Sequence, residues 1–348
     1  MKGKVYIVHE YGAPSHFYAL DYLLASRDIP SDKYELNLLG QLKEAVKKRS
    51  FRPIIRMLRN LGFLLSLPFL KPAKMVLGLA PYDRTLALLR PFLKRHQVYY
   101  FTSYTCWDGS REVHPSGPRT KAVWLDFLRQ DAVHIFAVSE KTRAELLRNG
   151  LADESRVSVV GHSYVSRPMA PEVRKKDNGF IAACSLVPWK GIEELLDCFS
   201  ARPEAHLTIV GRGPLVEKVK AAEAACPNIH YAGYITDQKT LFETYRQHSF
   251  FVLNSKRTAQ WEELFGMGLI EVSACGLVPL APTHSGPCEI LQDGENGVLF
   301  EEGDLSSALD RCLGWSDDRY DIVRQGAIAN GGRFYVASMV DRWEKVLE

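Results

Sequence analysis

Short runs of apolar residues alternate with segments of helical periodicity along almost the whole chain. This alternation is typical of α/β proteins, in which a helix connects each strand to the next parallel strand. The pattern predicts strands at residues 5–8, 98–103, 135–138, 157–160, 180–183, 206–210, 229–232, 250–253 and 277–281. It predicts helices at residues 140–148, 192–199, 215–225, 239–245, 266–275 and 305–313. Ser139 suits the N-cap of the first helix, because its hydroxyl can accept a hydrogen bond from a free backbone N–H group.

A connecting segment separates the two halves of this pattern. Residues 161–179 are rich in proline, serine and charged side chains, a composition typical of linkers. We therefore expect two Rossmann-like domains, an N-terminal one at residues 1–165 and a C-terminal one at residues 166–330, followed by a terminal segment at residues 331–348. The length of 348 residues agrees with this division, since an ordinary domain has about 150 residues.

Composition excludes several other protein classes. The chain is 46% hydrophobic and 24% charged, so a disordered, collagen-like or coiled-coil protein is not expected. The formal net charge is only +3, but it is distributed unevenly. Residues 1–165 hold 25 basic and 15 acidic side chains, a net charge of +10, whereas residues 166–348 have a net charge of −7. The two halves are therefore expected to meet different partners.

The segment 41–95 contains 13 of the basic residues and only two acidic ones. Its apolar side chains could share one helical stripe, formed by Phe51, Ile54, Ile55, Leu58, Phe63 and Leu67. The basic side chains near this stripe are Lys47, Lys48, Arg49, Arg52, Arg56 and Arg59. Such a stripe can lie in an anionic membrane interface, where each neighbouring Lys or Arg contributes about 1 kcal/mol. Alternatively, the stripe packs on a sheet and its charges are solvated.

Two prolines favour the membrane interpretation of this segment. Pro53 and Pro68 argue against one long core helix, because proline interrupts the hydrogen bonding of a helix interior. Nucleic acid is a less favoured partner, since the basic residues alternate with aliphatic side chains and match no nucleic-acid-binding motif.

Cysteine usage and hydropathy indicate a cytoplasmic location. The seven cysteines are odd in number and show no C-x-x-C spacing, so we expect reduced thiols and no zinc site. The first apolar run ends after Val8 and predicts a strand rather than a signal peptide. The longest apolar stretch, residues 61–70, is about half a membrane span. We expect a cytoplasmic protein that is peripheral at the inner face of the membrane.

The strongest chemical signal lies in residues 261–300. Glu263 falls in a loop after the strand at 250–253, and Glu271 follows eight positions later, inside the next helix. The glycine-rich start of this helix offers free N–H groups and the positive end of the helix dipole, which would favour a bound diphosphate. Glu271 could then accept hydrogen bonds from a ribose diol, and Glu263 could face a sugar beyond the phosphates.

This region resembles the donor-site signature of family 4 retaining glycosyltransferases. The E-x(7)-E pair is followed by the G-x-P turn at 276–279, the loop at 285–290 and the D-G-x-N-G sequence at 293–297. Three shorter matches are LVPWKG at 186–191, HLTIVGRG at 206–213 and HYAGYI at 230–235. The resemblance is good over residues 135–300, where FAVSEKTRAELLRNG and VSVVGHS also match loosely, and extends over 1–134 only in outline.

The resemblance implies the fold and the activity. It implies the GT-B fold, two Rossmann-like domains that face each other across a cleft, with the segment 331–348 as a helix that returns to the N-terminal domain. It implies transfer of a sugar, with retention, from a nucleotide diphosphate sugar, UDP or GDP, with no further cofactor and no metal. The expected acceptor is a saccharide or a lipid-linked saccharide of cell-surface polysaccharide or glycolipid synthesis, bound by the basic N-terminal domain.

The resemblance also assigns roles to residues. Glu263 would contact the donor sugar as a catalytic residue, Glu271 the ribose, and Lys190 the donor phosphates, a point-charge role that suits lysine. The other expected donor-binding residues are Gly12, Ser185, Gly233, Tyr234, Phe265, Gly266, Met267 and Gly286. The expected acceptor-binding residues are His16, Ser103 and Trp107.

Two positions depart from the family pattern. Ser185 stands where the family usually has an arginine, so one phosphate-neutralising cation is missing or comes from Arg212 or Lys256. The histidine that the family often has after a central strand of the first domain is also absent. Asp108, Ser103 or His114 could take its place, and we favour Asp108 as the catalytic group.

Other functions remain as alternatives. A nucleotide-dependent oxidoreductase would need G-x-G-x-x-G after its first strand, but YIVHEYGAPSHF contains one glycine. A GT-B epimerase or phosphorylase is a second alternative. A third is a non-catalytic partner subunit that binds a sugar nucleotide or a membrane, which the loss of the arginine at Ser185 would explain.

Overall fold

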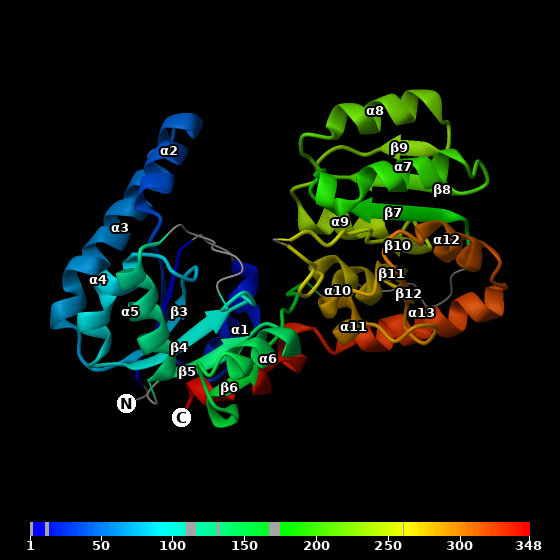
Figure 1. The fold of residues 1–348 in the computed structure, drawn as a ribbon. Coiled ribbons are helices and arrows are strands. Elements are labelled where there is room, and N and C mark those ends of the chain that lie inside the picture. The colour runs from blue at the N-terminus through cyan, green and yellow to red at the C-terminus, as the bar shows by residue number, and fades with distance from the viewer. Residues whose placement is uncertain (1–2, 11–13, 109–115, 131–132, 167–174, 260) are drawn as a thin grey trace. The chain divides into compact units, whose positions relative to one another are not determined.

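The chain forms two compact units (Figure 1). The computed structural model describes residues 3–10, 14–108, 116–130, 133–166, 175–259 and 261–348. Unit 1 comprises Met1–His162 together with Val340–Glu348, and unit 2 comprises Ser163–Met339. The first boundary falls close to the expected one at 165. At the other end, residues 331–339 lie with unit 2, and only the last nine residues return to unit 1.

Unit 1 contains a six-stranded parallel sheet with the order β2-β1-β3-β4-β5-β6. Its strands are β1 (Val5–His9), β2 (Ser31–Glu35), β3 (Lys74–Gly78), β4 (Gln97–Thr102), β5 (Val133–Ala137) and β6 (Val157–Val159). Its α-helices are α1 (Tyr18–Ser26), α2 (Leu38–Lys48), α3 (Arg52–Ser66), α4 (Thr85–Leu93), α5 (Pro118–Arg129) and α6 (Glu140–Arg148). Short 3-10 helices are η1 (Pro14–Phe17), η2 (Leu67–Phe69) and η3 (Glu154–Arg156).

The pattern predicts four of the six strands of unit 1, namely β1, β4, β5 and β6. The predicted helix 140–148 is α6, and the Ser139 side chain accepts a hydrogen bond from the Thr142 N–H group as an N-cap. The pattern missed β2 and β3. The sequence of β2, SDKYE, is polar because β2 is an edge strand that keeps contact with solvent. The core strand β3 lies inside the basic segment 41–95, whose charges hid its short apolar run.

The segment 41–95 is not one continuous helix. The chain leaves α2 at Arg49, which has a left-handed conformation with φ of 47°, and α3 starts afresh with Pro53 in its first turn. Two members of the expected apolar stripe, Phe63 and Leu67, do not belong to an exposed surface. The Phe63 ring stacks on the Tyr34 ring at a centroid distance of 3.8 Å, and Leu67 is 3% exposed, so both belong to the core of unit 1.

Unit 2 has a second six-stranded parallel sheet, with the order β12-β11-β10-β7-β8-β9. Its strands are β7 (Gly179–Ala183), β8 (His206–Val210), β9 (Ile229–Tyr231), β10 (Phe250–Val252), β11 (Val278–Pro282) and β12 (Val298–Phe300). Its α-helices are α7 (Ile192–Ser200), α8 (Val216–Ala225), α9 (Gln238–Tyr245), α10 (Met267–Ala274), α11 (Ser285–Ile290), α12 (Leu305–Leu313) and α13 (Asp317–Gly332). It also contains the 3-10 helices η4 (Pro188–Lys190) and η5 (Val336–Ser338).

The longest helix of unit 2, α13, was not predicted. It ends in Asn330, Gly331 and Gly332, residues of low helix propensity. Packing stabilises it instead, because α13 lies against α10 so closely that a Cβ atom on Gly331 would lie 2.5 Å from the Ala274 nitrogen. Tertiary contact therefore overrides propensity in this helix.

The returning segment forms a helix of the 3-10 type, η6 (Val340–Val346). Its Trp343 is 1% exposed and packs against the rings of Phe17, Phe101 and Phe136 at centroid distances between 4.7 and 6.1 Å. The Tyr99 hydroxyl donates to the Lys345 carbonyl at 2.9 Å, and the Lys74 amine donates to the Val346 carbonyl at 2.8 Å. These contacts attach the last residues of the chain to the sheet of unit 1.

We predict that Trp343→Ala destabilises the protein by about 3–5 kcal/mol, because it leaves a cavity among buried aromatic rings. The change is measured by chemical denaturation followed by circular dichroism. Asp341→Ala, an exposed position in the same η6, is the control and should change the unfolding free energy by less than about 0.5 kcal/mol. Equal stability of Trp343→Ala and the parent would show that the returning segment contributes nothing to the core.

Candidate functional site

The loop between β10 and α10 lies beside the loop between β11 and α11. Gly286 makes this approach possible, since a Cβ atom there would lie 2.2 Å from the Phe265 nitrogen. The Gly286 N–H group donates to the Glu263 carbonyl at 3.0 Å. Gly266, with φ of 92°, precedes Met267 at the start of α10 and has no side chain to cap the helix. The first turn of α10 therefore keeps N–H groups available for an anion.

Lys190 and Glu263, which the sequence places 73 positions apart, form a direct ion pair. The Lys190 amine donates to Glu263 Oε2 at 2.6 Å, and the Ser255 hydroxyl donates to the same oxygen at 3.1 Å. The amine also lies 4.5 Å from the centre of the Trp261 ring, a cation–π contact. The two charged side chains are only 16% and 15% exposed. Two residues with separate expected partners thus neutralise each other.

Glu271 lies inside α10 with its carboxyl group largely removed from solvent. This burial raises the pKa of the Glu271 carboxyl to about 7, and a hydrogen bond from Gln238 opposes the shift. A neutral carboxyl group and a carboxylate are therefore similar in free energy at neutral pH. A diol that donates hydrogen bonds to this group would favour the carboxylate form.

The turns after β7, β8 and β9 adjoin one another. Gly233 has φ of 74°, and its carbonyl accepts a hydrogen bond from the Gly211 N–H group at 2.9 Å. Tyr234 is half exposed, and the Arg212 guanidinium lies over its ring at 4.2 Å. A flat ring with a cation over it can hold a planar heterocycle.

The two cations considered as substitutes for the missing arginine have other partners. Ser185 itself is exposed in the turn after β7. Lys256 forms an ion pair with Glu194, and its backbone N–H group donates to the Trp189 carbonyl at 2.8 Å. Arg212 is engaged with the Tyr234 ring. Each would have to exchange its present partner for a phosphate.

Sequence reasoning missed three residues of this site. His284 is fully buried, with Nε2 at 2.9 Å from Glu302, while its Nδ1 accepts a hydrogen bond from the Glu263 N–H group at 3.5 Å. Ser255 and Trp261 contact the Lys190–Glu263 pair, as described above. The only available signal was position, since Trp261 and His284 flank the two loops that contain the signature residues.

Three of the expected residues of unit 1, His16, Trp107 and Asp108, each contact a different partner. His16 stacks on His162 at 4.9 Å, and burial lowers the pKa of its imidazole. Asp108 lies 3.8 Å from Arg148 and is largely solvated. Ser103 is exposed, whereas Trp107 is buried and donates to the Tyr104 carbonyl at 3.0 Å. Gly12 and His114 lie outside the described residues.

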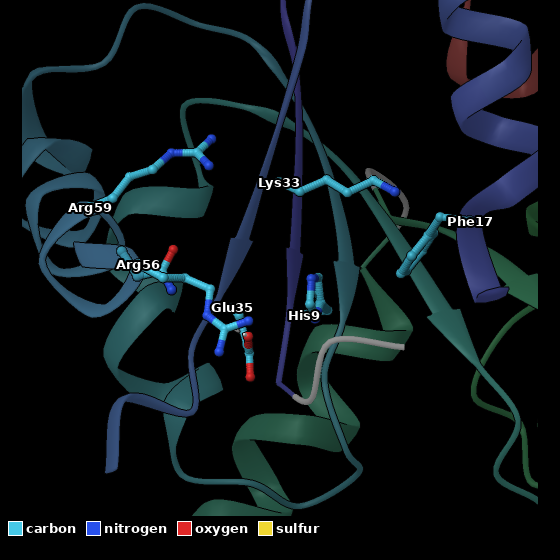
Figure 2. A pocket seen from close by; sticks show the side chains of 7 residues that line it. His9, Phe17, Lys33, Glu35, Arg56 and Arg59 are labelled. Atoms are coloured by element: carbon cyan, nitrogen blue, oxygen red, sulfur yellow. Dashed lines mark ion pairs between the residues drawn. The ribbon is translucent and has the colours of Figure 1, made fainter. Parts of the chain in front are cut away.

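A cavity of about 290 Å³ lies in unit 1 (Figure 2). It is lined by His9, Phe17, Lys33, Glu35, Arg56, Arg59 and Asn60. His9 and Glu35 end the neighbouring strands β1 and β2, and carboxyl ends of parallel strands are where α/β sheets commonly bind ligands. Burial, and then the charge of Lys33, lowers the pKa of His9 to about 4. His9 is thus a neutral group in a cavity that four charged side chains also line, Lys33, Glu35, Arg56 and Arg59.

The described residues contain neither a helix that could span a membrane nor a cluster of metal ligands. No helix in this part of the chain is both long enough and apolar enough to span a bilayer. No group of three or more His, Cys, Asp or Glu side chains among the same residues is arranged to hold a metal ion.

The sequence of unit 2 matches a known family. The family profile "Glycosyl transferases group 1" matches residues 169–331. The chain is 26% identical over 217 residues to the O-antigen biosynthesis glycosyltransferase WbnH of Escherichia coli. It is 28% identical over 145 residues to a GDP-mannose-dependent alpha-mannosyltransferase of Corynebacterium glutamicum. The first alignment covers 61% of this chain and 59% of WbnH, and the second covers 42% of this chain and 32% of its partner.

The fold matches solved structures over nearly the whole chain. Anabaena Alr3699/HepE in complex with UDP aligns with a TM-score of 0.69 and 16% identity, covering 99% of both chains. The apo form of the lipopolysaccharide outer core galactosyltransferase WaaB aligns with a TM-score of 0.61 and 16% identity, also over 99% of both chains. Together with the two parallel sheets, these likenesses confirm the expected fold class, GT-B with two Rossmann-like domains.

The raised pKa of Glu271 predicts a pH-dependent stability. The unfolded carboxyl titrates near 4.5 and the folded one near 7, so ionisation becomes unfavourable for the folded state as the pH rises through this interval. Relative to Glu271→Gln, the parent should lose about 3 kcal/mol of unfolding free energy between pH 4.5 and pH 8. Urea denaturation of both proteins across this range measures the difference. A difference that stays constant with pH would contradict the raised pKa.

Proposed function

We propose that the protein is a retaining glycosyltransferase that uses a nucleotide diphosphate sugar, because the profile of the glycosyl transferases group 1 family matches residues 169–331, nearly all of unit 2. The observation that supports this most strongly is the arrangement at the start of α10. A lysine, a glutamate and uncapped helix N–H groups meet there, with Glu271 further along the same helix. This set offers partners for a diphosphate, a sugar hydroxyl and a ribose.

The donor site works by electrostatic preorganisation. Cleavage of the sugar–phosphate bond leaves negative charge on the diphosphate, and Lys190 and the first turn of α10 are in place to stabilise that charge. Glu263 accepts hydrogen bonds from donor sugar hydroxyls, and Glu271 from the ribose. The half-exposed Tyr234 and the Gly233 backbone face the nucleobase. No metal or further cofactor is needed for these contacts.

The chemical step transfers the sugar with retention at its anomeric carbon. The bond from that carbon to the diphosphate oxygen breaks, and a bond to the acceptor oxygen forms on the same face. The acceptor hydroxyl gives its proton to the leaving diphosphate. Asp108 is our candidate for the unit 1 group near this carbon, because it is an accessible carboxylate that follows β4.

In our proposal the nucleotide of the donor is UDP or GDP. Anabaena Alr3699/HepE was crystallised with UDP and with UDP-glucose, and the Corynebacterium relative is named for GDP-mannose. The acceptor in our proposal is a lipid-linked saccharide of cell-surface polysaccharide or glycolipid synthesis. The name of WbnH, an O-antigen biosynthesis glycosyltransferase, supports a saccharide acceptor. The acceptor binds to unit 1, where the cavity of Figure 2 lies at strand ends, and the protein works in the cytoplasm at the inner membrane face.

A second candidate function is that of a non-catalytic partner subunit with the same fold. Ser185 replaces the expected arginine, and both substitute cations are held by other groups, Lys256 by Glu194 and Arg212 by Tyr234. A subunit of this kind would bind a nucleotide sugar without cleaving it.

We expect the purified protein to release nucleotide from a UDP or GDP sugar when a membrane extract supplies the acceptor. Glu263→Ala should slow this release by about 100-fold or more, because a transition-state contact is lost. Glu262→Gln is the control. Glu262 is next to Glu263 in the sequence, but its carboxylate contacts Arg257 and Ser285, so the substitution should leave the rate nearly unchanged. Absence of release by the parent with every donor would favour the partner-subunit function.

The Lys190–Glu263 ion pair predicts opposite effects on two ligands. In the free protein Glu263 competes with phosphate for Lys190, so Glu263→Gln should bind the nucleoside diphosphate alone at least about threefold more tightly. The same variant should bind the complete nucleotide sugar more weakly, because the sugar loses its carboxylate partner. Isothermal titration with UDP, GDP and their sugars measures both. Weaker binding of the bare diphosphate would show that the pair does not compete with the donor.

A further inference from the structure

A single region of unit 1 exposes an unusual amount of apolar surface. More than half of the strongly exposed large apolar side chains among the described residues fall between positions 39 and 69. They are Leu39, Leu42, Val46, Phe51, Ile55, Leu58, Leu61, Leu65 and Phe69. Phe51 is 80% exposed and Phe69 84%. We call these nine side chains the apolar face; contiguous exposed apolar surface of this kind marks an interaction site.

The apolar face is separate from the face of α3 that packs on the sheet. Phe51, Ile55, Leu58 and Leu65 recur at spacings of three, four and seven, which places them along one side of α3. Asn60, Phe63 and Leu67 are buried against unit 1. Figure 1 shows α2 and α3 at one edge of unit 1, and α3 contacts the edge strand β2. The core of unit 1 therefore leaves this second side of α3 uncovered.

Exposed basic side chains accompany the apolar face. Residues 38–69 contain seven basic residues and one acidic residue, Glu44, which forms an ion pair with Arg56. Lys43, Lys47, Arg49 and Arg52 are exposed. Arg56 and Arg59, which we also expected at the membrane, pair with carboxylates and line the cavity of Figure 2. Lys48 lies in α2, and its side chain is not described.

We infer that the apolar face of α2, α3 and η2 inserts into the interface of an anionic lipid bilayer, parallel to the membrane plane. Apolar side chains that enter the acyl boundary and basic side chains that reach anionic headgroups are the two requirements for interfacial binding. A second copy of the chain is a poorer occupant, because it would bring two clusters of positive charge together. The bilayer complements both the apolar surface and its charge.

The inference identifies the surface that docks on the membrane, and it does not depend on the proposed activity. Docking through α2 and α3 would hold unit 1 against the surface from which a lipid-linked acceptor is presented, and this consequence alone rests on the proposed function. Membrane binding itself requires only the apolar face and its basic side chains. The two can therefore fail separately.

Co-sedimentation of the full-length chain with vesicles tests the docking surface. The anionic vesicles contain phosphatidylcholine with about 30% phosphatidylglycerol, because anionic lipid attracts basic segments. We expect the chain to bind these vesicles and to bind vesicles of phosphatidylcholine alone much more weakly. The triple variant Phe51→Ser, Ile55→Ser and Phe69→Ser should bind the anionic vesicles at least about 30-fold more weakly. The triple variant Lys43→Gln, Lys47→Gln and Arg52→Gln should bind the anionic vesicles about 100-fold more weakly than the parent and should lose most of the preference for anionic lipid.

A matched control removes similar apolar surface elsewhere. Leu88→Ser with Ile322→Ser changes two exposed apolar side chains, 73% and 62% exposed, on other helices and should bind vesicles like the parent. Thermal unfolding verifies that every variant is folded, and calorimetric titration with UDP and GDP reports the donor site independently. Unchanged vesicle binding of the Phe51 triple variant, or an equal loss in the control, would overturn the proposal. A dimer of the parent that this triple variant abolishes would assign the face to a second copy instead.

Discussion

The candidate site depends on one constraint, the parallel pairing of β7, β10 and β11 in adjacent positions of one sheet. Phe250 of β10 pairs with Phe180 on one side and with Val278 on the other, so the three strands end at the same edge. The loops that follow them must share the space beyond that edge. Lys190, Glu263 and Gly286 belong to these three loops. Their proximity follows from strand order, and the pair between Lys190 and Glu263 is the chemical result.

Electrostatics act on different scales in the two units. Unit 2 lies in the acidic half of the chain, yet its proposed task is to hold a diphosphate. Local groups must therefore supply the attraction, and a lysine of which only 16% is exposed beside a helix start does so more effectively than surface charge, because little water screens it. In unit 1 the positive charge is spread over α2 and the start of α3, where it acts on an extended surface. Net charge alone would assign the nucleotide to unit 1, whereas we propose that unit 2 binds it.

Much of the fold could be predicted from the apolar pattern, and its failures have specific causes. Apart from β3 and β12, the buried strands were predictable because both of their faces are covered and their residues are continuously apolar. The polar edge strand β2 was not, and neither was α13, whose glycines fit because it packs against α10. At the site, the positions of Lys190, Glu263 and Glu271 could be expected from motif spacing. The buried His284 and the aromatic Trp261 could not, since a single histidine or tryptophan has no spacing to interpret.

The sequence by itself determined the two-domain α/β class and the glutamates that flank the start of α10, because these depend on local periodicity and spacing. Only the tertiary structure decided which partner each side chain has. In the structure Lys190 forms an ion pair with Glu263, and burial raises the pKa of Glu271. Phe63 and Leu67 are buried in the core of unit 1, whereas Phe51 and Phe69 are exposed to solvent. The reason is physical: periodicity shows that a helix has apolar sides, but the packing of its neighbours decides which side is covered.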